Sequence, residues 1–399
     1  MKTVLNIQTH IPKTMTTEQK IRQRECFASA KRVVVKIGSN VLTKDSGLNL
    51  EVVHSVSRQI CDLIDRDMEM VLVSSGAMAA GLRKLGLSRR PDEIPQRQAV
   101  AAVGQAGLIM EYEKAFEQYG KKVAQILLTG DGLHQRKRYL NARNTLHTLI
   151  SWKIVPIINE NDTVSVEEIK FGDNDNLSAM IALLLDADLL INLTDIEGLY
   201  DKDPRTNPDA LLIPVVDTIH RDIENCASSI PGTLGTGGML TKIRAARKVS
   251  TAGIPMVIAR GSKEDILFRL FSGEEHGTFF TPRQEKMANR KCWIGFSVKP
   301  KGRLRIDDGA VRAILERGKS LLPIGITDVE GDFRMGAPVE FKNGSGDVLG
   351  VGLVNYSSAD IRKIMGLRTD QIAERLGLKP YDEVIHRDNL TVTGECGIS

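Results

Sequence analysis

The stretch VVVKIGSN at residues 33–40 decides the fold, because a run of β-branched residues ends beside a lysine and a Gly-Ser turn. A continuous apolar run of this kind is typical of a strand that is buried on both faces of a sheet. Such strands belong to parallel sheets, which helices cover on both sides. The stretch therefore predicts a central parallel strand, with Lys36 close to its carboxyl end.

Short apolar runs and longer helical patterns alternate from Arg32 to Arg260. The predicted strands are Val33–Ile37, Met70–Val73, Val123–Leu128, Ile154–Ile158, Leu189–Leu193 and Pro255–Ala259. The predicted helices are Leu50–Asp65, Gln98–Tyr119, Asn141–Ser151, Asn176–Leu185 and Met239–Thr251. This alternation predicts an α/β fold with a mostly parallel sheet sandwiched by helices. Ligands bind such sheets beyond the carboxyl ends of the strands, so the residues that follow each strand are the candidates for function.

The pattern changes after residue 272, where a polar segment leads into short runs divided by glycines. These runs predict a small β-barrel-like domain with helices at Asp308–Arg317 and Ser358–Ile364. We expect a polar leader at 1–27, the α/β domain at 28–273, a linker at 274–297, the small domain at 298–382 and a C-terminal tail at 383–399. Because the strands through Ala259 would complete the sheet, a chain ending near Gly273 is expected to keep it.

Composition excludes several classes of protein. The chain has 399 residues, of which 42% are hydrophobic and 26% charged, and its net charge is only +4. This balance is typical of a globular protein and does not indicate a dedicated nucleic-acid binder. No apolar run approaches the roughly 20 residues that span a bilayer, so we expect no membrane segment. The 5 cysteines are scattered and form no C-x-x-C pair, which favours a reducing cytoplasm.

Small and charged residues follow the first two strands. Lys36 precedes a Gly-Ser turn, and a lysine there either faces an anion or extends to the sheet edge. The second strand leads into SSGAMAAG at residues 74–81, which includes Ser75. Small residues at a helix start let the backbone approach an anionic ligand, although a tight packing turn between helix and sheet gives the same pattern.

Two polar clusters, NEND at residues 159–162 and GDNDN at residues 172–176, lie beyond the fourth strand. For single residues such as Asp175 or Asn176, capping of the next helix is the alternative explanation. Two clusters so close together favour a polar, amino-bearing substrate, a hydrated Mg²⁺ ion, or both. No residue is assigned as a protein ligand of a metal.

Two later segments resemble a phosphate site. The fifth strand ends at Thr194 and Asp195, and the loop LGTGGMLTK at residues 234–242 runs into a basic helix. The loop does not match the Walker A spacing, so a mobile surface loop is the alternative. Glycines and a lysine at a helix N-terminus do hold phosphates in general. The strands of one predicted sheet are thus followed by two lysines, two glycine turns and two carboxylate clusters. Phosphoryl transfer requires groups of these kinds to position the phosphates and stabilise their charge.

The segments also resemble one family in the same order. These are VVKIGSNVLT, SSGAMAAG, YLNARNTL (residues 139–146), PIINEND, FGDNDNLSA, LTDIEGLYDKDPR and GTGGMLTK. Together they are similar to the glutamate 5-kinases of the amino-acid kinase superfamily, densely over residues 32–262. Residues 298–382 resemble the PUA domain that many bacterial members carry.

The resemblance implies transfer of phosphate from ATP, with Mg²⁺, to the side-chain carboxylate of L-glutamate, the first step of proline biosynthesis. It implies that Lys36 and Lys242 hold the ATP phosphates and that Asp175 orients both lysines. The nucleotide site would comprise Lys36, Thr194, Asp195, Thr236, Gly237, Gly238, Met239, Leu240, Thr241 and Lys242. The glutamate site would comprise Ser75, Asp162 and Asn174, with Asn159 nearby. Inhibition by proline and a homo-oligomer, dimer or tetramer, are further implications.

Two alternatives remain open. Sister kinases that act on aspartate, carbamate, acetylglutamate or UMP share the strand-end lysine and the glycine turns, whereas the two polar clusters favour glutamate. A separate alternative is RNA binding by the small domain, which carries seven basic residues against three acidic ones between Lys299 and Lys319. A solvated basic face explains these residues better, because aromatic stacking partners are sparse there.

Overall fold

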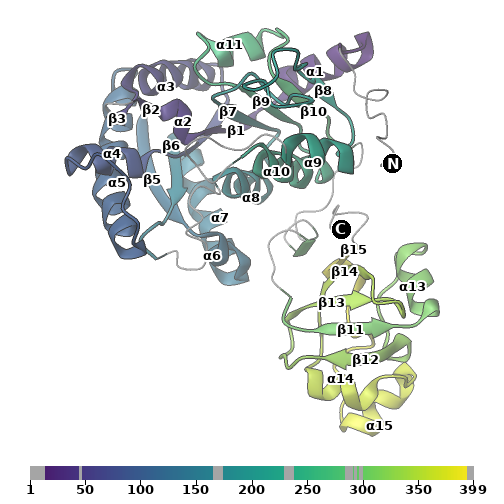
Figure 1. Cartoon of the computed structure of the whole chain (residues 1–399). Coiled ribbons are helices and arrows are strands. Elements are labelled where there is room, and N and C mark those ends of the chain that lie inside the picture. Colours follow the sequence, from purple (N-terminus) through teal and green to yellow (C-terminus); the bar gives the residue numbers. More distant parts are fainter. Residues whose placement is uncertain are drawn as a thin grey trace. The chain divides into compact units, whose positions relative to one another are not determined.

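The computed structural model describes residues 14–44, 47–164, 174–228, 238–283, 291, 294–295 and 300–392. The chain divides into two compact units, residues 1–284 and residues 285–399. The first unit contains an α/β sandwich and the second a small β-rich fold, and both are drawn in Figure 1.

The first unit is built on one eight-stranded sheet with the order β5-β6-β4-β1-β7-β9-β10-β8. Neighbouring strands run parallel except for β10, which is antiparallel to β9. The strands are β1 (Arg32–Ile37), β4 (Glu69–Ser74), β5 (Lys122–Leu128), β6 (Ile154–Glu160), β7 (Leu189–Thr194), β8 (Val215–Val216), β9 (Met256–Arg260) and β10 (Thr278–Phe280). A two-stranded ribbon, β2 (Thr43–Lys44) and β3 (Gly47–Leu48), lies outside this sheet.

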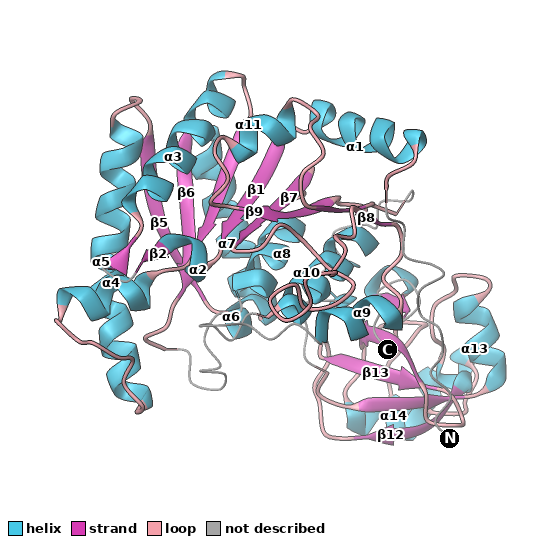
Figure 2. Cartoon of the chain, turned by 45° about the horizontal axis from the view of Figure 1, so that its top comes forward, coloured by secondary structure: helices cyan, strands magenta, loops and turns pink. Residues whose placement is uncertain are grey.

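Helices cover both faces of the sheet (Figures 1 and 2). One face packs against α1 (Thr17–Ser29), α3 (Leu50–Asp65), α5 (Ile94–Glu117) and α11 (Ile266–Phe271) in a single apolar cluster. The opposite face carries α7 (Arg136–Ser151), α8 (Asn174–Leu185) and α10 (Met239–Thr251). Shorter helices are α2 (Ser39–Leu42), α4 (Ala77–Lys84), α6 (Gly130–His134) and α9 (Arg221–Ser228).

Strand β1 shows how the sheet positions a functional side chain. Val33, Val35 and Ile37 belong to the cluster beneath α1, α3, α5 and α11. Side chains alternate between the two faces of a strand, so Lys36 lies on the face of α8 and α10. Its ammonium group contacts Asp175, which is on α8.

The α/β fold with a mostly parallel sheet is confirmed, and each of the six predicted strands is found. Strands β8 and β10 and helix α4 were not predicted, because each is short and carries little periodicity of its own. Most of helix α1 falls within the polar leader expected at residues 1–27. Phe27 of α1 is fully buried and meets Phe271 edge-to-face, with ring centroids 5.1 Å apart, so α1 packs on α11 within the first unit.

The second unit contains a five-stranded sheet with the order β12-β11-β13-β14-β15. Its strands are β11 (Arg303–Ile306), β12 (Ile326–Glu330), β13 (Pro338–Lys342), β14 (Val348–Leu353) and β15 (Leu390–Val392). Helices α13 (Asp308–Leu315), α14 (Ser358–Ile364) and α15 (Ile372–Leu376) accompany it. Strand β15 pairs with β14 and lies inside the segment expected to be a C-terminal tail, so the sheet extends past residue 382.

Within the part of the chain that the structure describes, no helix is both long enough and apolar enough to cross a membrane.

The position of β10 changes the expectation for a shortened chain. Strand β10 lies after Gly273, between β9 and β8, and Phe279 and Phe280 on it are buried in the core. A chain ending at Gly273 therefore loses an interior strand, whereas a chain ending at residue 284 keeps the whole first unit.

We predict that the chain ending at residue 284 unfolds cooperatively and that the chain ending at Gly273 does not fold stably. Loss of two buried phenylalanines alone costs about 6–10 kcal/mol, which is comparable to the whole stability of a domain. Thermal melts followed by circular dichroism compare the two chains directly. Equal melting temperatures would show that β10 is dispensable for the sheet.

Candidate functional site

A cavity of about 520 Å³ opens at the carboxyl ends of β1, β4, β6 and β7. Parallel strands end at the same edge of a sheet, and this brings residues far apart in the sequence into one site. Of the residues predicted from the sequence, eight line the cavity: Lys36, Ser75, Asn159, Asp162, Asn174, Thr194, Asp195 and Lys242. Asp175, Gly238, Met239, Leu240 and Thr241 lie behind its wall or beside it, and Thr236 and Gly237 lie outside the described residues.

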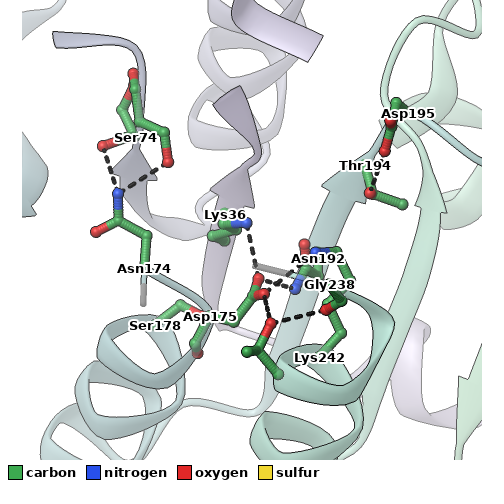
Figure 3. Close-up of polar contacts among 12 residues, drawn as sticks. Lys36, Ser74, Asn174, Asp175, Ser178, Asn192, Thr194, Asp195, Gly238 and Lys242 are labelled. Atoms are coloured by element: carbon green, nitrogen blue, oxygen red, sulfur yellow. Dashed lines mark hydrogen bonds and ion pairs between the residues drawn. The ribbon is translucent and has the colours of Figure 1, made fainter. Parts of the chain in front are cut away.

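Asp175 joins the two predicted lysines at the centre of this wall (Figure 3). One carboxylate oxygen, Oδ1, lies 2.7 Å from the Lys36 ammonium, and the other, Oδ2, lies 3.1 Å from the Lys242 ammonium. All three side chains are buried, Asp175 completely. Lys36 comes from the end of β1 and Lys242 from the first turn of α10, so the carboxylate bridges two separate elements.

Asp175 and Lys36 make different contacts from those that their alternative roles require. Helix α8 begins at Asn174, so Asp175 lies in its first turn, and its carboxylate accepts hydrogen bonds from side chains rather than capping the backbone. Lys36 does not extend to the sheet edge, because its ammonium is buried against Asp175. Asn176 accepts a hydrogen bond from Lys248.

Two further donors complete the shell around Asp175. The Asn192 amide donates to Oδ1 over 2.8 Å and the Thr241 hydroxyl donates to Oδ2 over 2.6 Å. Sequence analysis did not assign Asn192. Only its position in the sheet identifies Asn192 as part of the site. Asn192 pairs in register with Lys36 across β1 and β7, so the two side chains lie on the same face of the sheet.

Burial by itself would raise the pKa of Asp175, but Lys242, Lys36 and the hydrogen bonds outweigh it and hold that pKa below its ordinary value. The carboxylate is therefore ionised throughout the physiological range, and both lysines keep a counter-charge. Two ammonium groups share this one carboxylate, and both lysines line the cavity. Ammonium groups suit the phosphates of a nucleotide.

Asn174, directly before Asp175, connects to the other side of the cavity. Its amide nitrogen donates to the Ser75 hydroxyl over 2.8 Å and to Oδ1 of Asn159 over 3.0 Å. Ser75 precedes α4, whose N-cap is Gly76 at a φ of 104°, a left-handed conformation that glycine tolerates. The backbone N–H groups of the first turn of α4 thus face the same region as Ser75, and such groups favour an anion.

Asp162 lies on the cavity wall, where burial raises the pKa of its carboxyl to about 6, against the opposing effect of Arg90. Arg90 and Arg89 also line the cavity, and sequence analysis assigned neither of them. They belong to the connection between α4 and α5, far from any predicted strand end, and no local pattern distinguishes them.

Thr194 and Asp195 form the side of the cavity next to β7 and α10. The Thr194 hydroxyl donates to Asp195 over 3.0 Å, and the Asn40 amide donates to the same carboxylate over 2.8 Å. Gly38 lies between these elements, where an added Cβ would come 3.3 Å from the Leu193 carbonyl oxygen and 3.6 Å from the Lys36 ammonium. A glycine there keeps the space above the lysine open.

The described residues hold no group of three acidic, histidine or cysteine side chains that could bind a metal ion. Charged side chains of both signs line the cavity: Lys36, Lys242, Arg89 and Arg90 are basic, and Glu160, Asp162 and Asp195 are acidic.

One of the basic residues between Lys299 and Lys319 is held in ion pairs on the sheet of the second unit. Arg303, on β11, pairs with Glu330 at 3.3 Å and with Glu340 at 3.1 Å, from the strands on either side. These pairs neutralise Arg303, whereas Arg305, Arg312, Arg317 and Lys319 are exposed.

We predict that Asp175→Ala lowers the free energy of unfolding by about 3–5 kcal/mol, because it leaves two buried ammonium groups without their counter-charge. The depressed pKa gives the sign of the pH effect: the stabilisation is present above the ordinary aspartate pKa and is lost as the solution becomes more acidic. Urea unfolding from pH 3 to pH 8 should therefore show a shallower acid dependence in the variant. A stability difference of less than about 1 kcal/mol at pH 7 would contradict this role for Asp175.

Comparison with known proteins identifies the family to which both units of the chain are similar. The sequence profile of the amino acid kinase family matches residues 31–260, and that of the PUA domain matches residues 302–376. The chain is 52% identical over 370 residues to a glutamate 5-kinase of Syntrophus aciditrophicus, covering 93% of this chain and 96% of the relative. It is 50% identical over 367 residues to a glutamate 5-kinase of Geobacter sulfurreducens, covering 92% of this chain and 98% of the relative.

Among solved structures, carbamate kinase from Giardia lamblia is 17% identical, with a TM-score of 0.47 over 64% of this chain and 100% of that chain. The two sequence relatives are far more similar, and they span both units. The chain therefore belongs to the amino acid kinase family, among its glutamate 5-kinases, and carries a C-terminal PUA domain.

Proposed function

We propose that the protein transfers the γ-phosphoryl group of ATP to the side-chain carboxylate of L-glutamate, giving L-glutamyl 5-phosphate and ADP, the first step of proline biosynthesis. The observation that carries this proposal is the pair of buried lysines held on one carboxylate at the wall of the cavity. Similarity to glutamate 5-kinases over more than nine-tenths of the chain supports the choice of acceptor.

The reaction needs positioning and cations more than acid–base chemistry. An oxygen of the glutamate side-chain carboxylate attacks the γ-phosphorus, and the bond from that phosphorus to the bridging oxygen of ADP breaks. The attacking carboxylate is already ionised at neutral pH, so no general base has to remove a proton from it. Lys36 and Lys242 stabilise the negative charge of the transferring group, and Asp175 with Asn192 and Thr241 fixes their positions.

Mg²⁺ enters as part of the substrate MgATP. Mg²⁺ commonly binds through substrate phosphates and one or two carboxylates, with water filling the other positions.

We assign the nucleotide to the side of the cavity formed by Thr194, Asp195 and the start of α10. The Gly238 carbonyl accepts a hydrogen bond from Thr241, and the N-terminus of the 13-residue helix α10 favours phosphate. Met239 and Leu240 begin that helix beside Lys242. Thr236 and Gly237, which lie outside the described residues, complete the proposed loop.

Glutamate binds on the opposite side, at Ser75, Asn174, Asn159 and Asp162. The Ser75 hydroxyl and the N-terminus of α4 suit a substrate carboxylate, and the ionised Asp162 suits its ammonium group. The two lysines lie between this side and the nucleotide side, where the side-chain carboxylate meets the γ-phosphate.

Three finer properties are proposals that rest on the family resemblance. They are inhibition by proline, assembly into a dimer or tetramer, and location in the cytoplasm. Trp152, at the end of α7, is 68% exposed and is the kind of side chain that subunit interfaces favour. Cys26, Cys61 and Cys226 are free thiols, which suits a reducing compartment.

Trapping the acyl phosphate with hydroxylamine tests the function. The protein is incubated with MgATP and each of glutamate, aspartate, acetylglutamate, carbamate and UMP, and hydroxamate and ADP are measured. We expect hydroxamate with glutamate alone. Hydroxamate formed with aspartate in preference, or ADP released only with carbamate or UMP, would assign the site to a sister kinase.

We predict that Lys36→Ala and Lys242→Ala each lower kcat by about 10²–10³, because each removes one cation from the transferring phosphoryl group. Folding is less affected than in Asp175→Ala, because Asp175 keeps its other lysine, Asn192 and Thr241. The matched control is Lys114→Ala, which removes an exposed surface lysine. Near-normal turnover in both site variants would contradict the assignment.

We predict that the KM for glutamate falls as the pH rises through about 6, because the raised pKa of Asp162 leaves its carboxyl neutral below that point. Asp162→Asn should raise this KM at pH 8 by about 10-fold or more and remove its pH dependence, since a charged hydrogen bond is lost. Asp92→Asn, in the exposed connection nearby, is the control. An identical pH profile for the wild-type chain and Asp162→Asn would show that another group binds the ammonium.

A further inference from the structure

Gln105 does not line the cavity but supports its wall from behind. It is a half-buried residue of helix α5, and its Oε1 accepts a hydrogen bond from the Asn159 amide over 2.7 Å. Asn159 is at the end of β6 and is buried in the cavity wall. The contact therefore links a helix on one face of the sheet to the edge where the substrate binds.

Two hydrogen bonds hold the Asn159 amide in one orientation. Its nitrogen donates to Gln105 over 2.7 Å, and its Oδ1 accepts from the Glu160 backbone N–H over 2.9 Å. In this orientation Oδ1 also accepts from the Asn174 amide over 3.0 Å. An amide has donors at one end and an acceptor at the other, so reversing Asn159 would set N–H groups against N–H groups.

The orientation passes on through Asn174 to Ser75. Since the Asn174 nitrogen donates to Asn159, it also donates to the Ser75 oxygen, 2.8 Å away. Ser75 thus accepts from Asn174, and because Ser75 lines the cavity, we infer that its own O–H is available to donate to a ligand there. We call the series Gln105, Asn159, Asn174 and Ser75 the amide relay. In this series the Ser75 hydroxyl acts as a hydrogen-bond donor towards the cavity.

Helix α5 is held tightly enough to act as the fixed end of the amide relay. Gly104 approaches α4 so closely that an added Cβ would lie 1.8 Å from the Ala77 carbonyl oxygen. Further along α5, the buried Tyr112 hydroxyl lies 2.9 Å from the Ser74 hydroxyl. The same helix thus supports the residue before Ser75 and the start of α4.

We propose that Gln105 is a positioning residue for the acceptor substrate: through the amide relay it sets Ser75 as a donor and so tunes the site to a carboxylate. The inference rests on the proposed function, since it concerns the glutamate side of the cavity. It assigns a role to a side chain that is outside the cavity lining and touches no substrate.

Two substitutions separate the acceptor atom of Gln105 from its bulk. Gln105→Met keeps the length of the side chain and removes the acceptor, and we expect it to raise the KM for glutamate about 3–10-fold, the effect of one neutral hydrogen bond. The KM for ATP and the kcat should stay within about twofold, because this contact serves the ground state and the transition state alike. Gln105→Glu keeps an acceptor at the same place and should restore the KM for glutamate.

Gln96→Met is the matched control, because Gln96 is an exposed glutamine on the same helix. It should leave all three constants unchanged. A KM for glutamate that stays at the wild-type value in Gln105→Met overturns the proposal. So does a Gln105→Glu variant as impaired as Gln105→Met, because bulk rather than the acceptor atom would then matter.

A double-mutant cycle with Ser75→Ala tests whether the effect passes through the amide relay. Ser75→Ala alone should raise the KM for glutamate about 10–100-fold, since a hydrogen bond to a charged group is lost. Adding Gln105→Met should then change it by less than about twofold, because residues that act through one series are not additive. Effects that multiply would show that Gln105 acts independently of Ser75 and would overturn the proposal.

The failure of this proposal is distinct from the failure of the proposed function. An inactive wild-type chain in the hydroxamate assay refutes the function. In that case binding of glutamate is still measured by thermal shift, for the wild type, Gln105→Met and Ser75→Ala. The quantity compared is the glutamate concentration that gives half of the maximal rise in melting temperature. A wild-type chain that is active, with the same KM in Gln105→Met, refutes the amide relay alone.

Discussion

The buried carboxylate of Asp175 is the constraint on which the site depends. Two lysines from different elements lie at 2.7 and 3.1 Å from its oxygens, and Asn192 and Thr241 occupy its remaining acceptor positions. Buried charges are costly unless they are paired and hydrogen-bonded, and this group satisfies both conditions. The ion pairs thus bring the end of β1, the first turn of α8 and the first turn of α10 together at one point.

The parallel sheet supplies the geometry that this group requires. Neighbouring parallel strands end at the same edge of the sheet, so the residues at the ends of β1, β4, β6 and β7 lie around one cavity. Side chains alternate between the two faces of a strand, so on β1 Lys36 lies on the face opposite to Val33, Val35 and Ile37. A register shift of one residue would turn Lys36 into the apolar cluster, and the buried charge makes that register costly.

The cavity has two sides of different chemical character. Next to the lysines and α10 it offers positive charge and backbone N–H groups, which suit phosphate. Next to β4 and β6 it offers amides, a hydroxyl and the half-buried Asp162, which suit a small substrate with both an ammonium and a carboxylate group. Asn174 and Asp175 are adjacent in the first turn of α8 and contact different sides of the cavity: Asn174 donates to Ser75 and Asn159, and Asp175 pairs with the two lysines.

The sequence by itself determined the fold class and the chemistry of the strand ends. Long apolar runs such as residues 33–37 and 189–193 indicate strands that are buried on both faces of a sheet. The lysines and glycine turns follow such runs directly, so their place at the strand ends is predicted from the sequence. The family motifs then proposed roles for Lys36, Lys242 and Asp175. Local pattern could not find Asn192, Arg90 or Gln105, because each is one polar residue within an ordinary strand, loop or helix. Their place depends on register and on contacts between elements far apart in the chain, such as Gln105 with Asn159. The same reason explains β10 and α1: a three-residue strand and a polar helix become part of the core only because the sheet and α11 already offer a surface against which Phe279 and Phe27 are buried.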